Sequence, residues 1–105
     1  MNIADLFDTM PQRYRKGSVE SATTYYFSVG DHKYTVFIDR DACRVERGKA
    51  VDQADVVLKT TAELFEQMVV RGKMPAAMDV MRGRVKTNDP GRLHKLREMF
   101  DFTPR

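Results

Sequence analysis

The sequence predicts a single α+β domain in which a group of strands is followed by a group of helices. Residues 22–47 hold three segments of β-branched and aromatic residues separated by short polar turns. After residue 60, apolar residues recur at the three- and four-residue spacing of an α-helix. The chain has 105 residues, of which 42% are hydrophobic and 31% charged. This size and composition are typical of one globular domain, spanning residues 1–105, with two layers.

The first helix is predicted over residues 3–14. Its apolar residues lie three and four positions apart and form one stripe: Ile3, Leu6, Phe7 and Met10. Asn2 is suited to cap its N-terminus, and Pro11 is expected to end the helix or to begin a further turn. The polar segment 13–20, which contains Gly17, is predicted to be a loop.

Three strands are predicted next, at residues 22–29, 33–39 and 42–47. In the first strand Tyr25 and Phe27 share one face and Tyr26 lies on the other, which predicts a central strand covered at least partly on both sides. Short turns around residues 30–32 and 39–41 join the strands. The third strand is more polar, as is typical of the edge of a sheet.

A fourth strand at residues 55–59 leads into the helical half of the chain. Thr60 and Glu63 have the spacing of a capping box, which predicts a helix over residues 61–71 that ends at Gly72. The inward face of this helix carries four apolar residues: Leu64, Phe65, Met68 and Val69. This stretch therefore begins the layer of helices.

Three more elements complete the predicted order. A short helix over 74–82 has Pro75 in its first turn and stops at Gly83, and a fifth strand follows at 84–87. A last helix begins at Asp89-Pro90 and runs to residue 100. The order α-β-β-β-β-α-α-β-α predicts a five-stranded, mostly antiparallel mixed sheet covered by helices.

Catalytic, metal and cofactor sites are not predicted. His32 lies in a turn and His94 on the polar side of a helix, while Cys43 lies on a strand without a nearby histidine. No Cys or His pair has metal-ligand spacing, and no glycine-rich phosphate-binding loop follows a strand. We therefore expect a protein that is not an enzyme and that needs no metal or cofactor.

The cellular location expected from the sequence is the cytoplasm. A single cysteine excludes an internal disulfide and fits a reducing compartment. The first ten residues lack the basic start of a secretory signal, and no apolar run approaches the roughly 18 residues of a membrane span.

The positive charge of the chain is concentrated in its second half. Residues 1–65 carry a net charge of −1 and residues 66–105 a net charge of +4. A basic surface suits nucleic-acid phosphates, lipid headgroups or an acidic partner, and it also occurs simply as a solvated face. The aromatic run 25–27 lies apart from the basic residues and outside any RNA-recognition pattern, so no nucleic acid is expected.

The stretch RGKMPAAMDVMRGRVK, residues 71–86, is the most informative part of the sequence. Met74, Met78 and Met81 fall on one side of a helix at 100° per residue. On periodicity alone, such a stripe is more often core than the wall of a ligand pocket. Flexible thioethers beside the small Ala77 also suit an adaptable apolar surface, so both interpretations remain open.

From residue 54 to residue 100 the chain resembles the lipid-binding domain of the sterol carrier protein type two family. The resemblance lies in the strand ADVVLKTT (54–61), the helix ELFEQMVVRGKM (63–74), the segment PAAMDVMRGRVKTND (75–89) and the helix end LHKLREMF (93–100). One departure is Asn88, which stands where the family often has glycine. The resemblance implies an apolar tunnel between sheet and helices, and binding or transfer of lipids such as fatty acids, acyl-CoA, phospholipids or sterols.

The resemblance also implies which side chains contact the ligand. The expected lining of the apolar tunnel is Phe65, Met68, Val69, Met74, Met78, Met81, Met99 and Phe100. Phe102 is a candidate plug at its mouth. The residues expected to contact a lipid headgroup or, transiently, a membrane surface are Arg71, Lys73, Arg82, Arg84 and Lys86.

An alternative function is an accessory or scaffold module of a lipid or quinone biosynthetic pathway that acts through protein contacts. A monomer or weak dimer is expected in either case.

Overall fold

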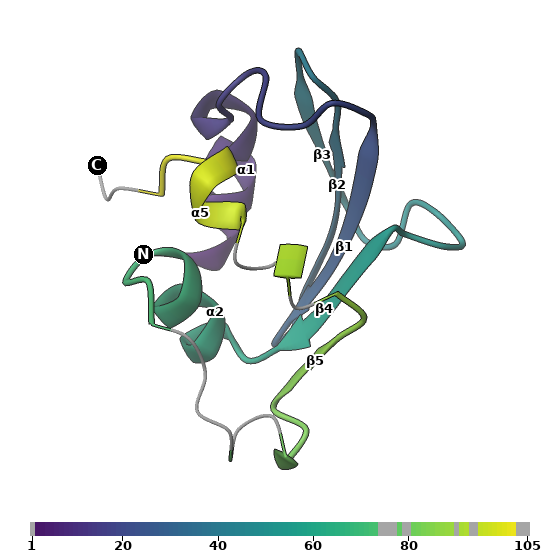
Figure 1. The fold of residues 1–105 in the computed structure, drawn as a ribbon. Helices are drawn as coiled ribbons and strands as arrows, with labels where there is room; N and C mark the ends of the chain where they lie inside the picture. Colours follow the sequence, from purple (N-terminus) through teal and green to yellow (C-terminus); the bar gives the residue numbers. More distant parts are fainter. Residues whose placement is uncertain (1, 74–77, 79–80, 90, 93–94, 103–105) are drawn as a thin grey trace.

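The computed structural model describes residues 2–73, 78, 81–89, 91–92 and 95–102. The helices and strands occur in the predicted order (Figure 1). Their bounds are α1 (Ile3–Arg13), β1 (Thr23–Val29), β2 (His32–Ile38), β3 (Cys43–Arg47), β4 (Val56–Thr60), α2 (Ala62–Val69), β5 (Val85–Thr87) and α5 (Leu96–Met99). Most of the helix predicted over 74–82, and parts of the one predicted over 89–100, lie outside the described residues.

The five strands form one open mixed sheet with the order β3-β2-β1-β4-β5. β1 and β4 are parallel neighbours, and the other three pairs are antiparallel. β1 lies at the centre of the sheet and β3 at one edge, as the aromatic and the polar compositions of these two strands predicted. The predicted α+β class and sheet are therefore confirmed.

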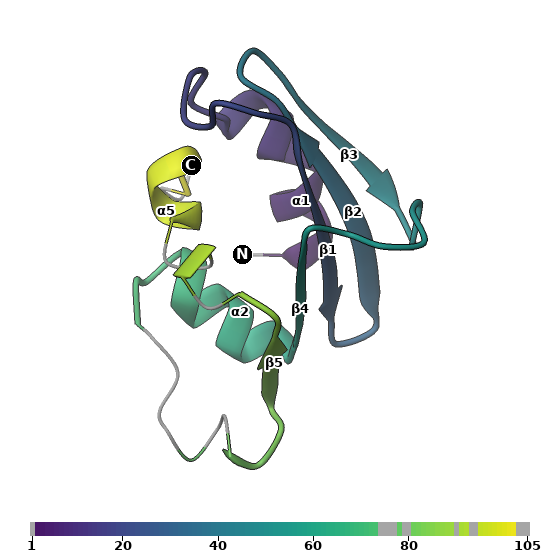
Figure 2. The same cartoon turned by 45° about the vertical axis from the view of Figure 1, so that its right-hand side comes forward.

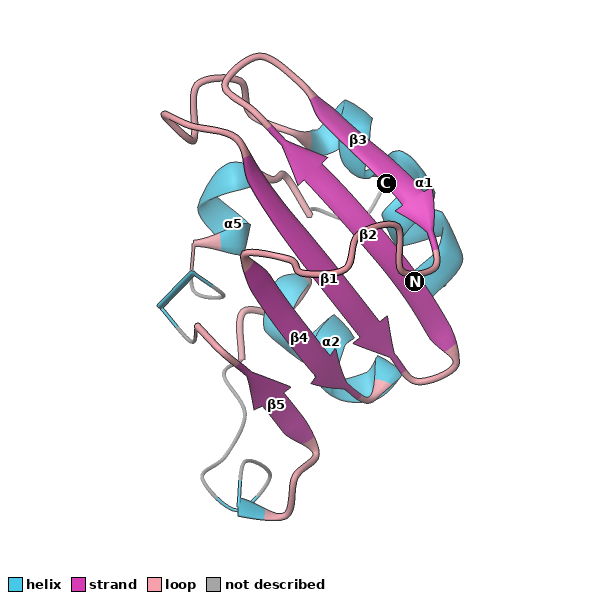
Figure 3. Cartoon of the chain, turned by 90° about the vertical axis from the view of Figure 1, so that its right-hand side faces the viewer, coloured by secondary structure: helices cyan, strands magenta, loops and turns pink. Residues whose placement is uncertain are grey.

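Helices α1, α2 and α5 lie on one face of the sheet, which is called the inner face here (Figures 1 and 2). The connection between β3 and β4 crosses the opposite, outer face in front of β1 and β2 (Figure 3). Thr35 on β2 holds this connection in place: its hydroxyl donates to the Gly48 carbonyl at 2.7 Å and accepts from the Ala50 amide at 2.9 Å. Both faces of the central strands are therefore partly covered.

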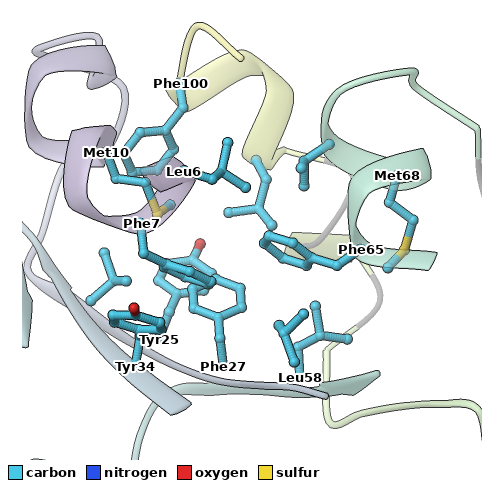
Figure 4. Packing of buried hydrophobic residues seen from close by; sticks show 14 of the residues in the cluster. Leu6, Phe7, Met10, Tyr25, Phe27, Tyr34, Leu58, Phe65, Met68 and Phe100 are labelled. Atoms are coloured by element: carbon cyan, nitrogen blue, oxygen red, sulfur yellow. The ribbon is translucent and has the colours of Figure 1, made fainter. Parts of the chain in front are cut away.

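The core lies between the inner face and the helices, and aromatic rings fill its middle (Figure 4). Phe7 of α1 stacks on Tyr34 with ring centroids 4.3 Å apart and lies 5.4 Å from both Phe27 and Phe65. Phe102, after α5, is 4% exposed and lies 5.6 Å from the Phe100 ring. Phe102 therefore packs back on the core.

The N-terminal cap of α1 is confirmed, and of the two alternatives predicted for Pro11 the structure shows the further turn. The Asn2 side chain accepts a hydrogen bond from the Ala4 amide at 2.8 Å. Pro11 lies inside the helix, which continues to Arg13. Because a buried stripe runs along α1 from Ile3 to Arg13, tertiary packing compensates for the hydrogen bond that proline cannot donate.

The cap of α2 lies one residue later than the capping-box spacing predicted. Thr61 is the N-cap, and its hydroxyl accepts from the Leu64 amide at 3.2 Å. Thr60 instead ends β4 and pairs with Val29 and Val85. Its side chain is 6% exposed, and its hydroxyl is the buried side-chain polar atom without a hydrogen-bond partner in the described part of the chain.

We expect Thr60→Val to raise the free energy of unfolding by about 1 kcal/mol, because an unpaired buried hydroxyl costs more than a methyl group. Urea denaturation measures the change. Thr61→Ala is the matched control and is expected to lower stability by about 1 kcal/mol, because it removes the cap. A loss of stability in Thr60→Val would mean that the hydroxyl has a partner.

Candidate functional site

Most of the predicted lining residues belong to the packed core between the inner face and the helices. Phe65, Met68 and Val69 project from α2, with exposed fractions of 0%, 7% and 2%. Met99 and Phe100, at the end of α5, are 3% and 1% exposed. The predicted inward faces of these two helical segments are therefore largely buried, with Leu64 of α2 only half-buried.

The other predicted lining residues are methionines of the 74–82 segment. Met78 is 58% exposed and Met81 is 85% exposed, so the prediction that these two face inward is wrong. The helical period shows that the two side chains share a face, but it does not show which neighbour that face meets. Met74 lies outside the described residues. A contact between any of the three and a ligand stays a prediction.

A crevice of about 620 Å³ opens where the start of β1 meets the 92–99 segment. Two members of the core, Tyr25 and Met99, form part of its wall, and polar and charged side chains surround them. The lining residues are Ser18, Val19, Glu20, Ser21, Thr23, Tyr25, Arg92, Lys95, Glu98 and Met99. The crevice thus extends from the surface to the edge of the core.

The Tyr25 hydroxyl is the distinctive polar group of this crevice. The side chain is 2% exposed and rises from the sheet toward the helices (Figure 4). Its hydrogen-bond contact among the described residues is the Met99 sulfur, 3.9 Å away, and a thioether is a weak acceptor. Burial raises the pKa of the Tyr25 hydroxyl, so this group remains a proton donor at neutral pH. Residue patterns did not indicate this crevice, because its walls come from segments distant in the sequence.

Residues of both charges surround the crevice. Arg92 and Lys95 contribute positive charge, and Glu20 and Glu98 contribute negative charge. Arg92 also lies 3.3 Å from the carboxylate of Asp89. The rim is therefore polar without a strong net charge, and it suits a polar group that both donates and accepts hydrogen bonds.

The basic residues predicted to contact a headgroup or membrane lie in two places: Arg82, Arg84 and Lys86 lie in and just before β5, whereas Arg71 and Lys73 follow the C-terminal end of α2. Arg71, Lys73, Arg82, Arg84 and Lys86 are all exposed. Arg84 borders a smaller pocket formed with residues of α2. Gly72 has a φ of +70°, a left-handed backbone conformation that favours glycine where the chain leaves α2.

Neither reactive chemistry nor a metal site is apparent in the described part of the chain. Burial raises the pKa of the half-buried Cys43 thiol to about 12, which leaves it protonated and a poor nucleophile at neutral pH. No group of three or more His, Cys, Asp or Glu side chains in this part could hold a metal ion. No helix within the same residues is long and apolar enough to cross a membrane.

Comparison with known proteins identifies the fold. No family model and no curated protein matches the chain. The solved structure of the sec-alkylsulfatase Pisa1 from Pseudomonas sp. superposes with a TM-score of 0.75 at 18% identity; the match covers 96% of this chain and 16% of the sulfatase. The chain therefore spans less than a fifth of the length of that enzyme.

Two solved structures of sterol carrier protein 2 domains also match. The UbiJ-SCP2 ubiquinone synthesis protein has a TM-score of 0.58 at 12% identity, covering 90% of this chain and 85% of that one. Sterol carrier protein 2 from Yarrowia lipolytica, in its apo form, has a TM-score of 0.50 at 19% identity, covering 72% and 64%. The chain thus has the fold of these domains, as its resemblance predicted.

Proposed function

We propose, from the sterol carrier protein 2 fold of this chain, that it binds lipids without chemically changing them. The observation that carries the proposal is the crevice beside β1, because its wall includes Tyr25 and Met99 of the core. Its volume of about 620 Å³ lies within the usual range of small-molecule sites. An apolar chain would enter beside Met99 and lie between the helices and the sheet.

The chemistry of the lining supports a ligand with a chain and a polar end. The predicted lining residues that are buried, Phe65, Met68, Val69, Met99 and Phe100, are all apolar, and thioether side chains adapt to ligands of variable shape. The rim of the crevice offers hydroxyls and both signs of charge to the polar end. Fatty acids, acyl-CoA, phospholipids and sterol-like molecules are the ligand classes that fit, with Phe102 near the mouth.

The same proposal includes transfer inside the cell. Arg71, Lys73, Arg82, Arg84 and Lys86 would attract an anionic headgroup or a membrane surface while a lipid is loaded or released. The protein would act as a monomer or weak dimer in the cytoplasm.

Lipid extraction and native mass spectrometry of the purified protein, together with titration by a fluorescent fatty acid, test the proposal. We expect co-purified lipid and saturable binding. Thr23 lines the crevice, whereas the next residue, Thr24, points to the outer face of β1. Thr23→Trp is therefore expected to weaken fatty-acid binding at least tenfold, and Thr24→Trp to leave it unchanged.

Two results would contradict lipid binding in this crevice. One is the absence of both co-purified lipid and saturable titration. The other is equal binding by the two tryptophan variants, which would place a fatty-acid site elsewhere. The chain contains no natural tryptophan, so each introduced indole also reports ligand contact by its own fluorescence.

A scaffold role is the second candidate. It is favoured by the likeness to the ubiquinone synthesis protein, which spans most of both chains. A pull-down that returns a biosynthetic enzyme, combined with no affinity for free lipid, would favour this role over lipid transfer.

A further inference from the structure

Three lysines from three different strands lie in one row on the outer face of the sheet. Lys33 of β2 is opposite Ser28 of β1, Ser28 is opposite Lys59 of β4, and Lys59 is opposite Lys86 of β5. Since neighbouring strands are about 4.8 Å apart, these side chains span four adjacent strands. All three lysines are exposed, and each is next to a buried residue of the inner face: Tyr34, Leu58 and Val85. We call them the lysine row.

Folding alone does not account for the lysine row. Lys59 and Lys86 are directly opposite in an antiparallel pair, where like charges destabilise the sheet. None of the ion pairs between described residues includes a lysine of the row. The exposed acids closest along the chain are Asp31, in the turn before Lys33, and Asp55 and Glu63, each four residues from Lys59. An arrangement that costs stability indicates an anionic partner outside the chain.

Exposed apolar side chains occur at the same end of the molecule. Met78 and Met81 are the exposed large hydrophobic residues of the described part of the chain, and they precede β5. The segment that leads into β5 lies at the tip of the molecule, beyond the ends of β1 and β4 (Figures 1 and 3). Arg82 and Arg84, between Met81 and β5, are exposed too. Basic side chains beside exposed methionine are typical of a protein surface that binds at the lipid–water interface.

The aromatic residues of the outer face argue against nucleic acid as the partner. Nucleic-acid-binding sheets use open aromatic rings on which bases stack. Here the Arg44 guanidinium lies 4.4 Å from the centre of the Phe37 ring, and the Lys49 ammonium lies 5.9 Å from that of Tyr26. Both rings are half-buried, and cations of the chain itself already lie over them.

We propose that the lysine row, together with Met81, docks the protein on a membrane that contains anionic lipids. The lysines contact the phosphates electrostatically, and Met81 inserts among the headgroups. This inference rests on the proposed function in one respect: both require that the protein meets lipid. Docking uses the outer face and the tip, whereas ligand binding uses the inner face, so separate measurements report each.

Sedimentation with phosphatidylcholine vesicles, with and without phosphatidylglycerol, tests the docking. We expect binding only to vesicles with phosphatidylglycerol, and weaker binding as salt rises. Each lysine near an anionic surface contributes about a fivefold change in affinity, so the triple variant Lys33→Gln/Lys59→Gln/Lys86→Gln is expected to bind about a hundredfold more weakly. Met81→Ser is expected to weaken binding further in the same assay.

The matched control is Arg15→Gln/Lys16→Gln/Arg40→Gln, which removes the same charge from exposed residues near the opposite end of the sheet. It is expected to keep at least a third of the wild-type affinity for vesicles. Lys59→Gln alone supplies a second readout, because it should raise the urea midpoint while weakening vesicle binding. A variant that weakened binding merely by unfolding the protein would lower both the urea midpoint and the affinity for vesicles.

Equal losses in the two triple variants, or no loss in the lysine-row variant, would overturn the proposal. Lysine-dependent binding of single-stranded RNA without vesicle binding would overturn it as well. If the wild type binds vesicles but no fluorescent fatty acid, the docking stands and the proposed function fails. If the wild type binds fatty acid saturably but does not bind vesicles, the proposed function stands and the docking fails.

Discussion

Phe7→Ala is expected to lower the free energy of unfolding by about 3–5 kcal/mol, the usual cost of removing a fully buried phenylalanine. The Phe7 side chain is fully buried, stacks on Tyr34 and lies 5.4 Å from Phe27 and Phe65. Its removal would therefore leave a cavity among rings from β1, β2 and α2. Urea denaturation followed by circular dichroism measures the loss.

The neighbouring substitution Asp8→Ala is the control for Phe7→Ala. Asp8 is on the same helix, its side chain is 52% exposed, and its carboxylate lies 3.9 Å from Arg47. Such an exposed ion pair contributes little, so the change is expected to stay within about 0.5 kcal/mol. A loss below about 1 kcal/mol in Phe7→Ala would contradict the central role assigned to this ring.

Arg13→Ala is expected to cost about 3 kcal/mol, because hydrogen bonds from a buried charged group are among the stronger ones. Arg13 is 7% exposed, and its guanidinium donates to the Thr9 hydroxyl and the Asp101 carbonyl, each at 2.9 Å. The Asp101 amide in turn donates to the Arg13 carbonyl. Arg13 therefore fastens the segment after α5 to the end of α1.

Hydrogen exchange distinguishes this fastening from a general loss of stability. In Arg13→Ala, hydrogen exchange at the Asp101 amide is expected to speed up, relative to the wild type, by more than exchange at the amides of β1 and β2. Arg13→Lys keeps the charge without the forked donor geometry and should give an intermediate loss. The exposed Arg15→Ala is the control and should change little. Unchanged exchange at Asp101 would contradict the assignment.

The elements of the fold were largely predictable because their signals are local. Strands β1 and β2 followed from alternating aromatic and β-branched residues, and the cap of α1 from Asn2. The cap of α2 was predicted one residue too early, since two threonines in succession offer the same hydroxyl. Only the extended pairing of Thr60 with Val29 and Val85 selects Thr61 as the cap.

The candidate site was predictable only in part. The buried faces of α2 and α5 followed from helical periodicity, so Phe65, Val69 and Met99 were expected to face inward. The same reasoning failed for Met78 and Met81, which are exposed. Periodicity shows which side chains share a helix face, but not which residues that face contacts. Nothing in the sequence indicated the Tyr25 crevice, because its wall residues, such as Thr23 and Arg92, are distant along the chain.

The sequence by itself determined which segments are helices and strands, which side of each is apolar, and where the basic residues concentrate along the chain. The tertiary structure decided which residues meet: Tyr25 beside Met99, and Lys33, Lys59 and Lys86 in one row. Secondary structure depends on residues a few positions apart, whereas sites and surfaces depend on strand order and register. Those are set by packing of the whole chain around a single core.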